Sequence, residues 1–217
     1  LAPDGLNATI AGSEQTVAQL EDWLRGLFPL SRCKRSRCQD APFRRWKVVT
    51  RRETIASGRI AEETASIQTT GHLSADEWHN KLQNEQVVVI DVRNDYEVAL
   101  GKFSGALDPK TSKFSEFVDF VAQLQLPKEQ PILTYCTGGI RCEKAVPYLK
   151  AQGYQNVYQL EGGILNYLEH HPHGFFEGEC FVFDDRVALD QELQPTRRYL
   201  RCPDCGQPGP DTFPCCH

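Results

Sequence analysis

Short apolar runs that alternate with helical patterns constrain the fold of this chain more than any other feature. The run at 87–90 reads Val-Val-Val-Ile, and the segments 132–135 and 157–160 are similarly short and largely apolar. Such runs are typical of strands that are buried on both faces. Apolar residues recur at helical spacing over 114–124 and 142–152. Strands that alternate with helices favour a parallel sheet covered by helices on both faces, so we predict an α/β fold.

The 217 residues are enough for one such domain with smaller pieces beside it. We predict four consecutive segments: an N-terminal domain at 1–54, a linker at 55–70, the α/β domain at 71–175 and a C-terminal extension at 176–217. The linker is inferred from a stretch rich in Ala, Ser and Thr that carries little periodicity. Ser74 and Glu77 would form a capping box at the first helix of the α/β domain.

The N-terminal segment predicts a small α+β arrangement. Residues 6–11 alternate as a strand does, apolar residues at helical spacing follow Ser13, and residues 45–50 indicate a second strand. Three elements in about 50 residues are too few to close a core of their own. The chain also opens at Leu1 without a methionine. We therefore expect an N-terminally truncated domain, and a lost targeting segment stays an open alternative.

A basic block lies within the N-terminal segment. Residues 32–52 carry nine Lys and Arg against one Asp, a net charge of +8 in a chain whose overall charge is −5. A basic block on an acidic protein is an electrostatic footprint for a polyanion such as RNA. Arg44, Arg45 and Lys47 would contact phosphates, and Phe43 and Trp46 lie between them for stacking on bases. The alternative is a solvated loop with Trp46 in a small core.

Cys136 is the candidate nucleophile of the α/β domain. The sequence Cys136-Thr137-Gly138-Gly139-Ile140-Arg141 lies between the predicted strand at 132–135 and the predicted helix at 142–152. Glycines allow backbone N–H groups to turn inward, and a helix N-terminus adds a positive dipole end. Together with Arg141 these features lower a thiol pKa and favour the thiolate. The alternative is a buried strand-end cysteine beside a turn.

The spacing of Cys136 and Arg141 narrows the chemistry. Cysteine phosphatases have five residues between the two, whereas this chain has four, and the tighter loop suits a single sulfur atom better than a tetrahedral oxyanion. The loop resembles the six-residue active loop of the rhodanese-like family. The flanking family motifs also have counterparts, which are Asp91-Val92-Arg93, Glu97, Gly101, Gly105-Ala106 and Leu160-Glu161-Gly162-Gly163. Lys102 stands where the family usually has histidine.

Three segments resemble one branch of that family, the bacterial tRNA uridine hydroxylases. They are 1–7, 136–145 and the nonapeptide at 178–186, Gly-Glu-Cys-Phe-Val-Phe-Asp-Asp-Arg. The resemblance implies a partial ferredoxin-like domain before the rhodanese-like domain, with tRNA as substrate and molecular oxygen as co-substrate. The product would be 5-hydroxyuridine at the wobble position. The alternative is a sulfurtransferase that takes sulfur from a small donor and carries it as a Cys136 persulfide.

The same loop would serve either activity. Cys136 would be the essential thiolate, the backbone N–H groups of Thr137, Gly138, Gly139, Ile140 and Arg141 would stabilise its charge, and Arg141 would orient the loop. Asp91 follows a buried strand, and we expect it to anchor Arg93 and thereby support the site, rather than act in catalysis. No haem, flavin or iron site is visible in the sequence.

Nine cysteines, an odd number, argue against a secreted disulfide scaffold. A thiolate nucleophile and clustered C-x2-C spacing instead suggest a reducing compartment, so we expect a cytoplasmic protein. No apolar run approaches the roughly 18 residues of a membrane helix. We expect Cys142 to point away from the loop, and Cys180 to pack rather than act as a resolving thiol. The tail predicts a structural zinc site, with His217 or Cys180 as alternative ligands. Its candidate ligands are Cys202, Cys205, Cys215 and Cys216.

Overall fold

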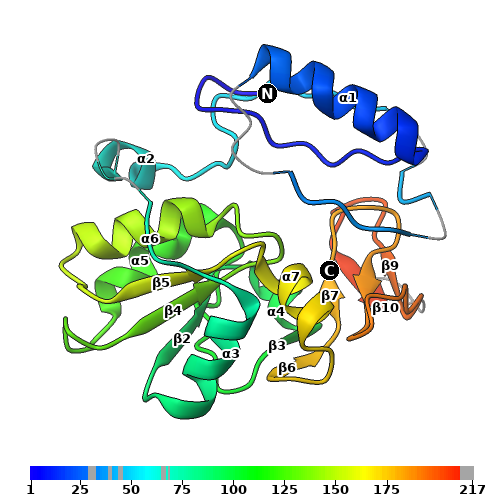
Figure 1. Cartoon of the computed structure of the whole chain (residues 1–217). Helices are drawn as coiled ribbons and strands as arrows, with labels where there is room; N and C mark the ends of the chain where they lie inside the picture. The colour runs from blue at the N-terminus through cyan, green and yellow to red at the C-terminus, as the bar shows by residue number, and fades with distance from the viewer. Residues whose placement is uncertain (29–32, 39–40, 44–45, 65–66, 68, 211–217) are drawn as a thin grey trace. The chain divides into compact units, whose positions relative to one another are not determined.

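The computed structural model describes residues 1–28, 33–38, 41–43, 46–64, 67 and 69–210. These residues form two compact units, Leu1–Thr54 and Ile55–His217 (Figure 1). No helix in the described ranges is both long and apolar enough to cross a membrane.

The first unit contains one helix, α1 (Glu14–Leu27), among its described residues. The helix begins where the sequence predicts, because the Ser13 hydroxyl accepts a hydrogen bond from the Thr16 amide at 3.2 Å. The strand predicted at 6–11 is wrong, and so is the described part of the strand predicted at 45–50. The two segments do not pair with each other. Instead Leu1 bonds to the later segment from both sides: its amino group donates to the Val49 carbonyl at 2.9 Å, and its carbonyl accepts from the Arg51 amide at 2.8 Å. Contacts of a single residue are too few for a ladder.

The second unit contains the predicted parallel sheet. Its strands are β1 (His72–Leu73), β2 (Val88–Asp91), β4 (Ile132–Tyr135) and β5 (Val157–Leu160). Their order across the sheet is β1-β5-β4-β2, and every pairing is parallel. The sheet therefore confirms the α/β fold class.

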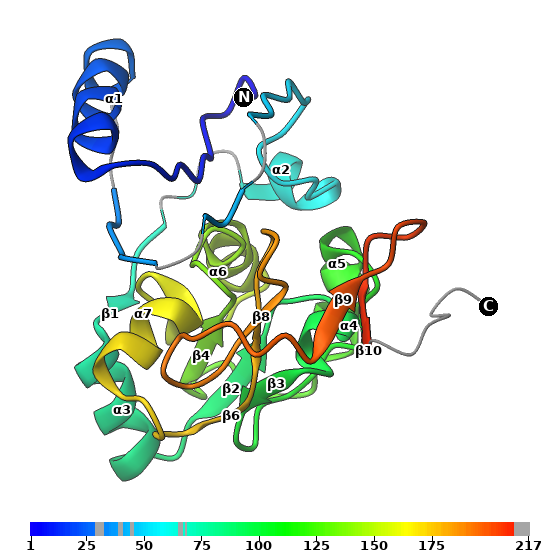
Figure 2. The same cartoon turned by 90° about the vertical axis from the view of Figure 1, so that its right-hand side faces the viewer.

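Helices cover both faces of this sheet (Figures 1 and 2). One face packs against α2 (Arg59–Thr64), α5 (Phe117–Gln123) and α6 (Cys142–Ala151), and the other against α3 (Ala75–Asn84) and α7 (Gly163–His170). Side chains alternate along each strand, so Ile90 lies in the first core while Val89 lies in the second. The predicted capping box at Ser74 and Glu77 is present.

The segment predicted as a linker, 55–70, is partly structured. It contains α2, whose Ile60 is fully buried in the same core as α5 and α6. Ile60 is a single large apolar residue, and one residue cannot show the helical spacing by which an amphipathic helix is predicted. The sequence therefore did not indicate α2.

The C-terminal extension forms short two-stranded sheets. β6 (Phe176–Gly178) pairs with β3 (Gly101–Phe103), β7 (Cys180–Phe181) with β8 (Ala188–Leu189), and β9 (Tyr199–Arg201) with β10 (Pro208–Pro210), all antiparallel. Two short helices, α4 (Asp95–Val98) and the 3₁₀ helix η1 (Phe114–Glu116), complete the second unit. Strands of two or three residues are too short to show alternation, which is why no pattern is visible after residue 174.

Candidate active site

The Cys136 loop lies at the carboxyl end of the parallel sheet, between β4 and α6, where open α/β sheets bind ligands. The Gly139 amide donates to Cys136 Sγ at 3.1 Å. Gly139 has a φ of +91°, which favours glycine and turns this amide inward. Of the amides predicted to face Cys136, those of Gly139 and Arg141 bond to its sulfur, and the amide of Cys142 joins them.

Backbone hydrogen bonds from the start of α7 hold the Cys136 loop in place. The amides of Ile164 and Leu165 donate to the carbonyls of Cys136 and Thr137 at 3.0 and 3.2 Å. Gly163 has a φ of +65°, and a Cβ at this position would overlap the Cys136 carbonyl. The turn at 162–163 is therefore glycine-rich because the loop backbone packs directly on it.

Cys136 is 1% exposed, and its surroundings favour the thiolate. Burial alone would raise the pKa of the thiol. A hydrogen bond from the Cys142 thiol, the positive charge of Arg141 and the amides of Arg141 and Cys142 outweigh burial and lower that pKa to about 6. The thiolate is consequently the main form of Cys136 at neutral pH.

Cys142 does not point away from the loop, contrary to the prediction from sequence. It lies in the first turn of α6, fully buried, with its thiol hydrogen-bonded to that of Cys136. Burial and the neighbouring Cys136 raise the pKa of Cys142 well above its ordinary value. It therefore keeps its proton and donates to the thiolate. The prediction failed because Cys142 is the first residue of α6, and the helix starts in an orientation that directs this side chain toward Cys136.

Glu97 of α4 holds Arg141 in place. Two hydrogen bonds, from Nη1 to Oε1 at 2.5 Å and from Nη2 to Oε2 at 2.7 Å, join the guanidinium to the fully buried carboxylate. Burial lowers the pKa of Arg141, but the charge and hydrogen bonds of Glu97 outweigh it and raise that pKa above its ordinary value. The Thr137 hydroxyl also donates to Glu97, at 3.3 Å. A fork of this kind fixes the plane as well as the position of the arginine.

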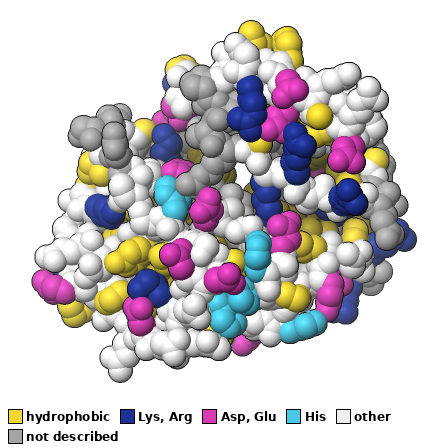
Figure 3. Space-filling model, in the orientation of Figure 1, with side chains coloured by type: hydrophobic (Ala, Val, Ile, Leu, Met, Phe, Trp, Pro, Cys, Tyr) yellow, Lys and Arg dark blue, Asp and Glu magenta, His cyan; other side chains and the backbone are white. Residues whose placement is uncertain are grey.

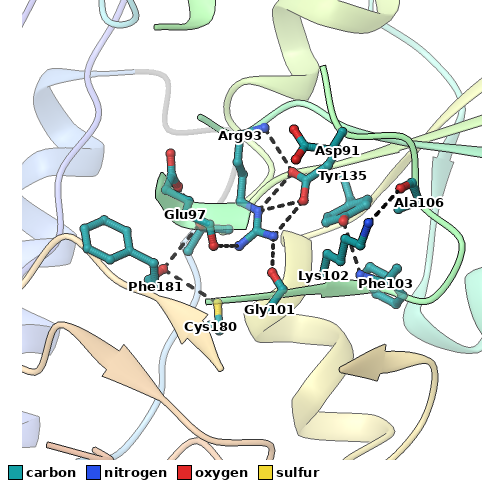
Figure 4. A network of polar contacts seen from close by, with 12 residues as sticks. Asp91, Arg93, Glu97, Gly101, Lys102, Phe103, Ala106, Tyr135, Cys180 and Phe181 are labelled. Atoms are coloured by element: carbon teal, nitrogen blue, oxygen red, sulfur yellow. Dashed lines mark hydrogen bonds and ion pairs between the residues drawn. The ribbon is translucent and has the colours of Figure 1, made fainter. Parts of the chain in front are cut away.

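Asp91 and Arg93 form the expected anchor beside the loop (Figure 4). Both side chains are fully buried, and Arg93 Nη2 lies 2.6 Å from Asp91 Oδ2. The same nitrogen donates to the Gly101 carbonyl at 2.6 Å, and Nη1 donates to the Glu97 carbonyl at 3.4 Å. Arg93 thereby ties β2 to α4 and β3 and holds the backbone that presents Glu97.

The C-terminal extension also reaches the loop. The Phe181 carbonyl lies 3.5 Å from the Thr137 hydroxyl and shares the single hydrogen of that hydroxyl with Glu97. The ring of Phe183 lies over the Arg141 guanidinium, 5.8 Å from ring centroid to Cζ. Cys180 packs in the core, and burial raises the pKa of its thiol to about 12. The nonapeptide at 178–186 therefore lines the loop.

The remaining predicted site residues lie elsewhere or outside the described residues. Lys47 is exposed in the first unit, and Trp46, 76% exposed, is not in a core. Arg44, Arg45, Cys215, Cys216 and His217 lie outside the described residues.

Cys202 and Cys205 flank the turn between β9 and β10. This turn is closed by a hydrogen bond from the Gly206 amide to the Cys202 carbonyl at 2.9 Å. Two thiols on one tight turn fit half of a tetrahedral zinc site. The described part of the chain contains no group of three metal-ligating side chains, so Cys180 does not join this pair. Figure 3 shows histidine side chains among acidic ones on this face of the molecule. His171 lies 2.8 Å from Asp76 and His173 lies 2.6 Å from Glu192, whereas the His170 ring contacts the Asn166 carbonyl at 2.9 Å.

Comparison with known proteins places this loop and fold in a known class. Residues 74–170 match the profile of the rhodanese-like domain, and residues 1–54 match that of the UPF0176 acylphosphatase like domain. The rhodanese-like domain of an Anabaena protein is a structural neighbour with a TM-score of 0.44 and 23% identity; the match covers 51% of this chain and 80% of that one.

Two relatives define the family more closely. A protein of Bdellovibrio bacteriovorus named tRNA uridine(34) hydroxylase is 45% identical over 99% of this chain and 62% of its own length. A protein of the same name from Synechococcus elongatus is 45% identical over 96% of this chain and 78% of its own length. The chain belongs to the tRNA uridine(34) hydroxylase family of rhodanese-like proteins.

Proposed function

We propose that this protein hydroxylates carbon 5 of the wobble uridine of tRNA and that Cys136 is the essential catalytic group. The proposal is supported by the names of the relatives and by one structural observation, a buried thiolate held by Gly139, Cys142 and Arg141. Molecular oxygen is the proposed oxidant: one of its atoms would enter the product, and a two-electron reductant such as a thiol, included in the assay, would reduce the other atom to water. Asp91 and Arg93 support the site through the backbone of Glu97.

Nucleoside mass spectrometry tests this proposal. Undermodified tRNA is incubated in air with the full chain, and separately with Cys136→Ser and with Cys33→Ser, a variant of an exposed cysteine in the first unit. We expect 5-hydroxyuridine with the wild type and with Cys33→Ser, and none with Cys136→Ser. Exclusion of oxygen should abolish the product, and incubation under ¹⁸O₂ should label it. Product formation by Cys136→Ser would contradict the proposal.

A sulfurtransferase is the second candidate, favoured by the four-residue spacing between Cys136 and Arg141. The Cys136 thiolate would attack the outer sulfur of thiosulfate and release sulfite. The resulting persulfide would pass that sulfur to a thiophilic acceptor and restore the thiolate. Transfer from thiosulfate to cyanide without any modification of tRNA would favour this candidate over the first.

We propose that the basic block contacts tRNA through Arg44, Arg45 and Lys47. Replacing all three by Ala should lower the slope of log affinity against log salt by about 3, because each lost phosphate contact lowers it by about 1. The matched control removes three charges from the second unit. Its substitutions are Arg59→Ala, Lys110→Ala and Lys113→Ala, at exposed side chains. If the two triple variants had equal slopes of log affinity against log salt, the basic block would not be the tRNA contact.

We also propose a structural zinc ion, held by Cys202, Cys205, Cys215 and Cys216. Its role would be to close the tail onto the β9–β10 turn, since structural zinc contributes folding energy. Elemental analysis of the purified full chain should find about one zinc per chain, and Cys205→Ser should lose it while Cys33→Ser retains it.

A cytoplasmic location is consistent with reduced thiols and a tRNA substrate.

A further inference from the structure

Phe183 is the most exposed large apolar side chain among the described residues of the second unit, at 57%. It stands at the edge of the catalytic loop, because its ring centroid lies 5.8 Å from the Arg141 guanidinium carbon. An exposed aromatic ring in water forfeits the free energy that its burial would contribute. A ring in this position therefore suggests a contact with a ligand.

The backbone that carries Phe183 is held rigidly. The Val182 amide donates to the Val187 carbonyl at 2.9 Å, and the Arg186 guanidinium pairs with Asp184 at 2.6 Å, which closes a tight turn. Arg201 Nη2 lies 3.4 Å from the carbonyls on either side of Phe183, those of Val182 and Asp184.

The ring itself is supported from behind. Phe181, which is buried, meets the Phe183 ring edge to face, with centroids 5.0 Å apart and an interplanar angle of 84°. Turn and support together fix the ring while much of it stays open to solvent. A rigid, exposed ring loses little entropy when a flat ligand stacks on it.

The charges around Phe183 indicate the kind of ligand. Arg141 lies over its ring, and Arg201 lies over the neighbouring ring of Phe181 at 5.8 Å. Phe183 and Arg201 are the exposed members of this group, since Phe181 and Arg141 are buried. An exposed ring beside an exposed arginine is the pattern on which single-stranded nucleic acid binds, with a base on the ring and a phosphate near the cation.

We propose that Phe183 is a stacking platform for the pyrimidine ring of the substrate nucleotide at the mouth of the Cys136 loop. This inference rests on the proposed function, since it assumes an RNA substrate. The platform would accept a base that has left the stack of the anticodon loop, and the neighbouring Arg141 would lie beside that base.

The test measures RNA affinity in the Cys136→Ser background of the full chain, so that no reaction occurs. Two anticodon stem-loop RNAs are compared, one with uridine at position 34 and one abasic at that position. Phe183→Ala should weaken binding of the uridine RNA about tenfold, the usual effect of a lost base–aromatic stack, and leave the abasic RNA unaffected. Phe183→Trp should retain affinity, whereas Phe183→Leu should lose most of it.

Leu200→Ala is the matched control, because Leu200 is 48% exposed in the same unit. It should change neither affinity. An equal loss on both RNAs, or no loss with Phe183→Ala, would overturn the platform. The pH midpoint of Cys136 alkylation in Phe183→Ala with the native cysteine should equal that of the wild type, because the groups that lower the Cys136 pKa are all retained; this shows that the loop is intact.

The outcomes separate this inference from the proposed function. If the selective loss is found but no 5-hydroxyuridine forms, the platform stands and the reaction is wrong. If the wild type modifies tRNA and Phe183→Ala has an unchanged kcat/KM, the platform is wrong and the reaction stands. If the chain binds neither RNA, both are wrong.

Discussion

The hydrogen bond from Cys142 to Cys136 makes a quantitative prediction about the reactivity of the catalytic thiol. Cys142→Ala removes the donor, whereas Cys142→Ser replaces it with a hydroxyl that is also a donor. A hydrogen bond to a charged group contributes about 1.5–3 kcal/mol, and one pKa unit corresponds to about 1.4 kcal/mol. The alanine variant should therefore raise the pKa of Cys136 by about 1–2 units from its value of about 6.

The assay is alkylation of Cys136 by iodoacetamide, followed between pH 5 and 9 by mass spectrometry of the Cys136 peptide. Peptide resolution is needed because Cys33, Cys38 and Cys205 are exposed. The wild-type rate should rise with a midpoint near pH 6. The midpoint of Cys142→Ala should lie near pH 7–8, as the lost hydrogen bond requires. The midpoint is the proper readout, because a more basic thiolate is also intrinsically more nucleophilic and reaches a higher plateau.

Cys180→Ala provides a matched control, since Cys180 is equally buried and of the same size but forms its hydrogen bond with the Phe181 carbonyl. Its midpoint should stay close to that of the wild type. The reasoning is refuted if Cys142→Ala also titrates near pH 6, or if Cys142→Ser shifts the midpoint as far as Cys142→Ala does.

Three further substitutions test the supports of the loop and the domain. Glu97→Gln removes the charge that pairs with buried Arg141 and should cost about 3–5 kcal/mol in urea unfolding, with loss of turnover; an unchanged unfolding midpoint would contradict this. Gly163→Ala should abolish turnover, because its Cβ would displace the Cys136 carbonyl, yet circular dichroism should still show a folded domain; wild-type turnover would exclude the overlap. Ile60→Ala should lower the free energy of unfolding by about 2–5 kcal/mol, whereas a surface linker would show almost no change.

The parts of the fold that could be predicted from sequence are those that local pattern specifies. Short, largely apolar runs located β2, β4 and β5 to within a residue or two. The capping box located the start of α3 because both of its residues lie within one turn. The strand predictions in the first unit were wrong because a strand depends on non-local pairing as well as on local pattern. A strand needs a ladder of hydrogen bonds to a partner strand, and among the described residues the later segment bonds only to Leu1 through Val49 and Arg51.

The catalytic loop could be predicted only in part. The nucleophile and its glycines are contiguous, so their spacing was informative. The orientation of Cys142 depends on how α6 meets β4, which no periodicity encodes. Glu97 is 44 residues from Arg141 in the sequence. No local pattern around a single acidic residue in a short helix indicates which distant residue it will pair with.

The loop is held mainly by groups that are distant in the sequence. Arg141 is oriented by α4, the carbonyls of Cys136 and Thr137 are fixed by α7, and the Thr137 hydroxyl is bound by the β7 carbonyl of Phe181. β7 lies beyond residue 170, where the rhodanese-like match ends. The extension is therefore part of the site rather than an appendage to it. Because it adds an exposed ring beside Arg141, its effect should be on which substrate approaches Cys136.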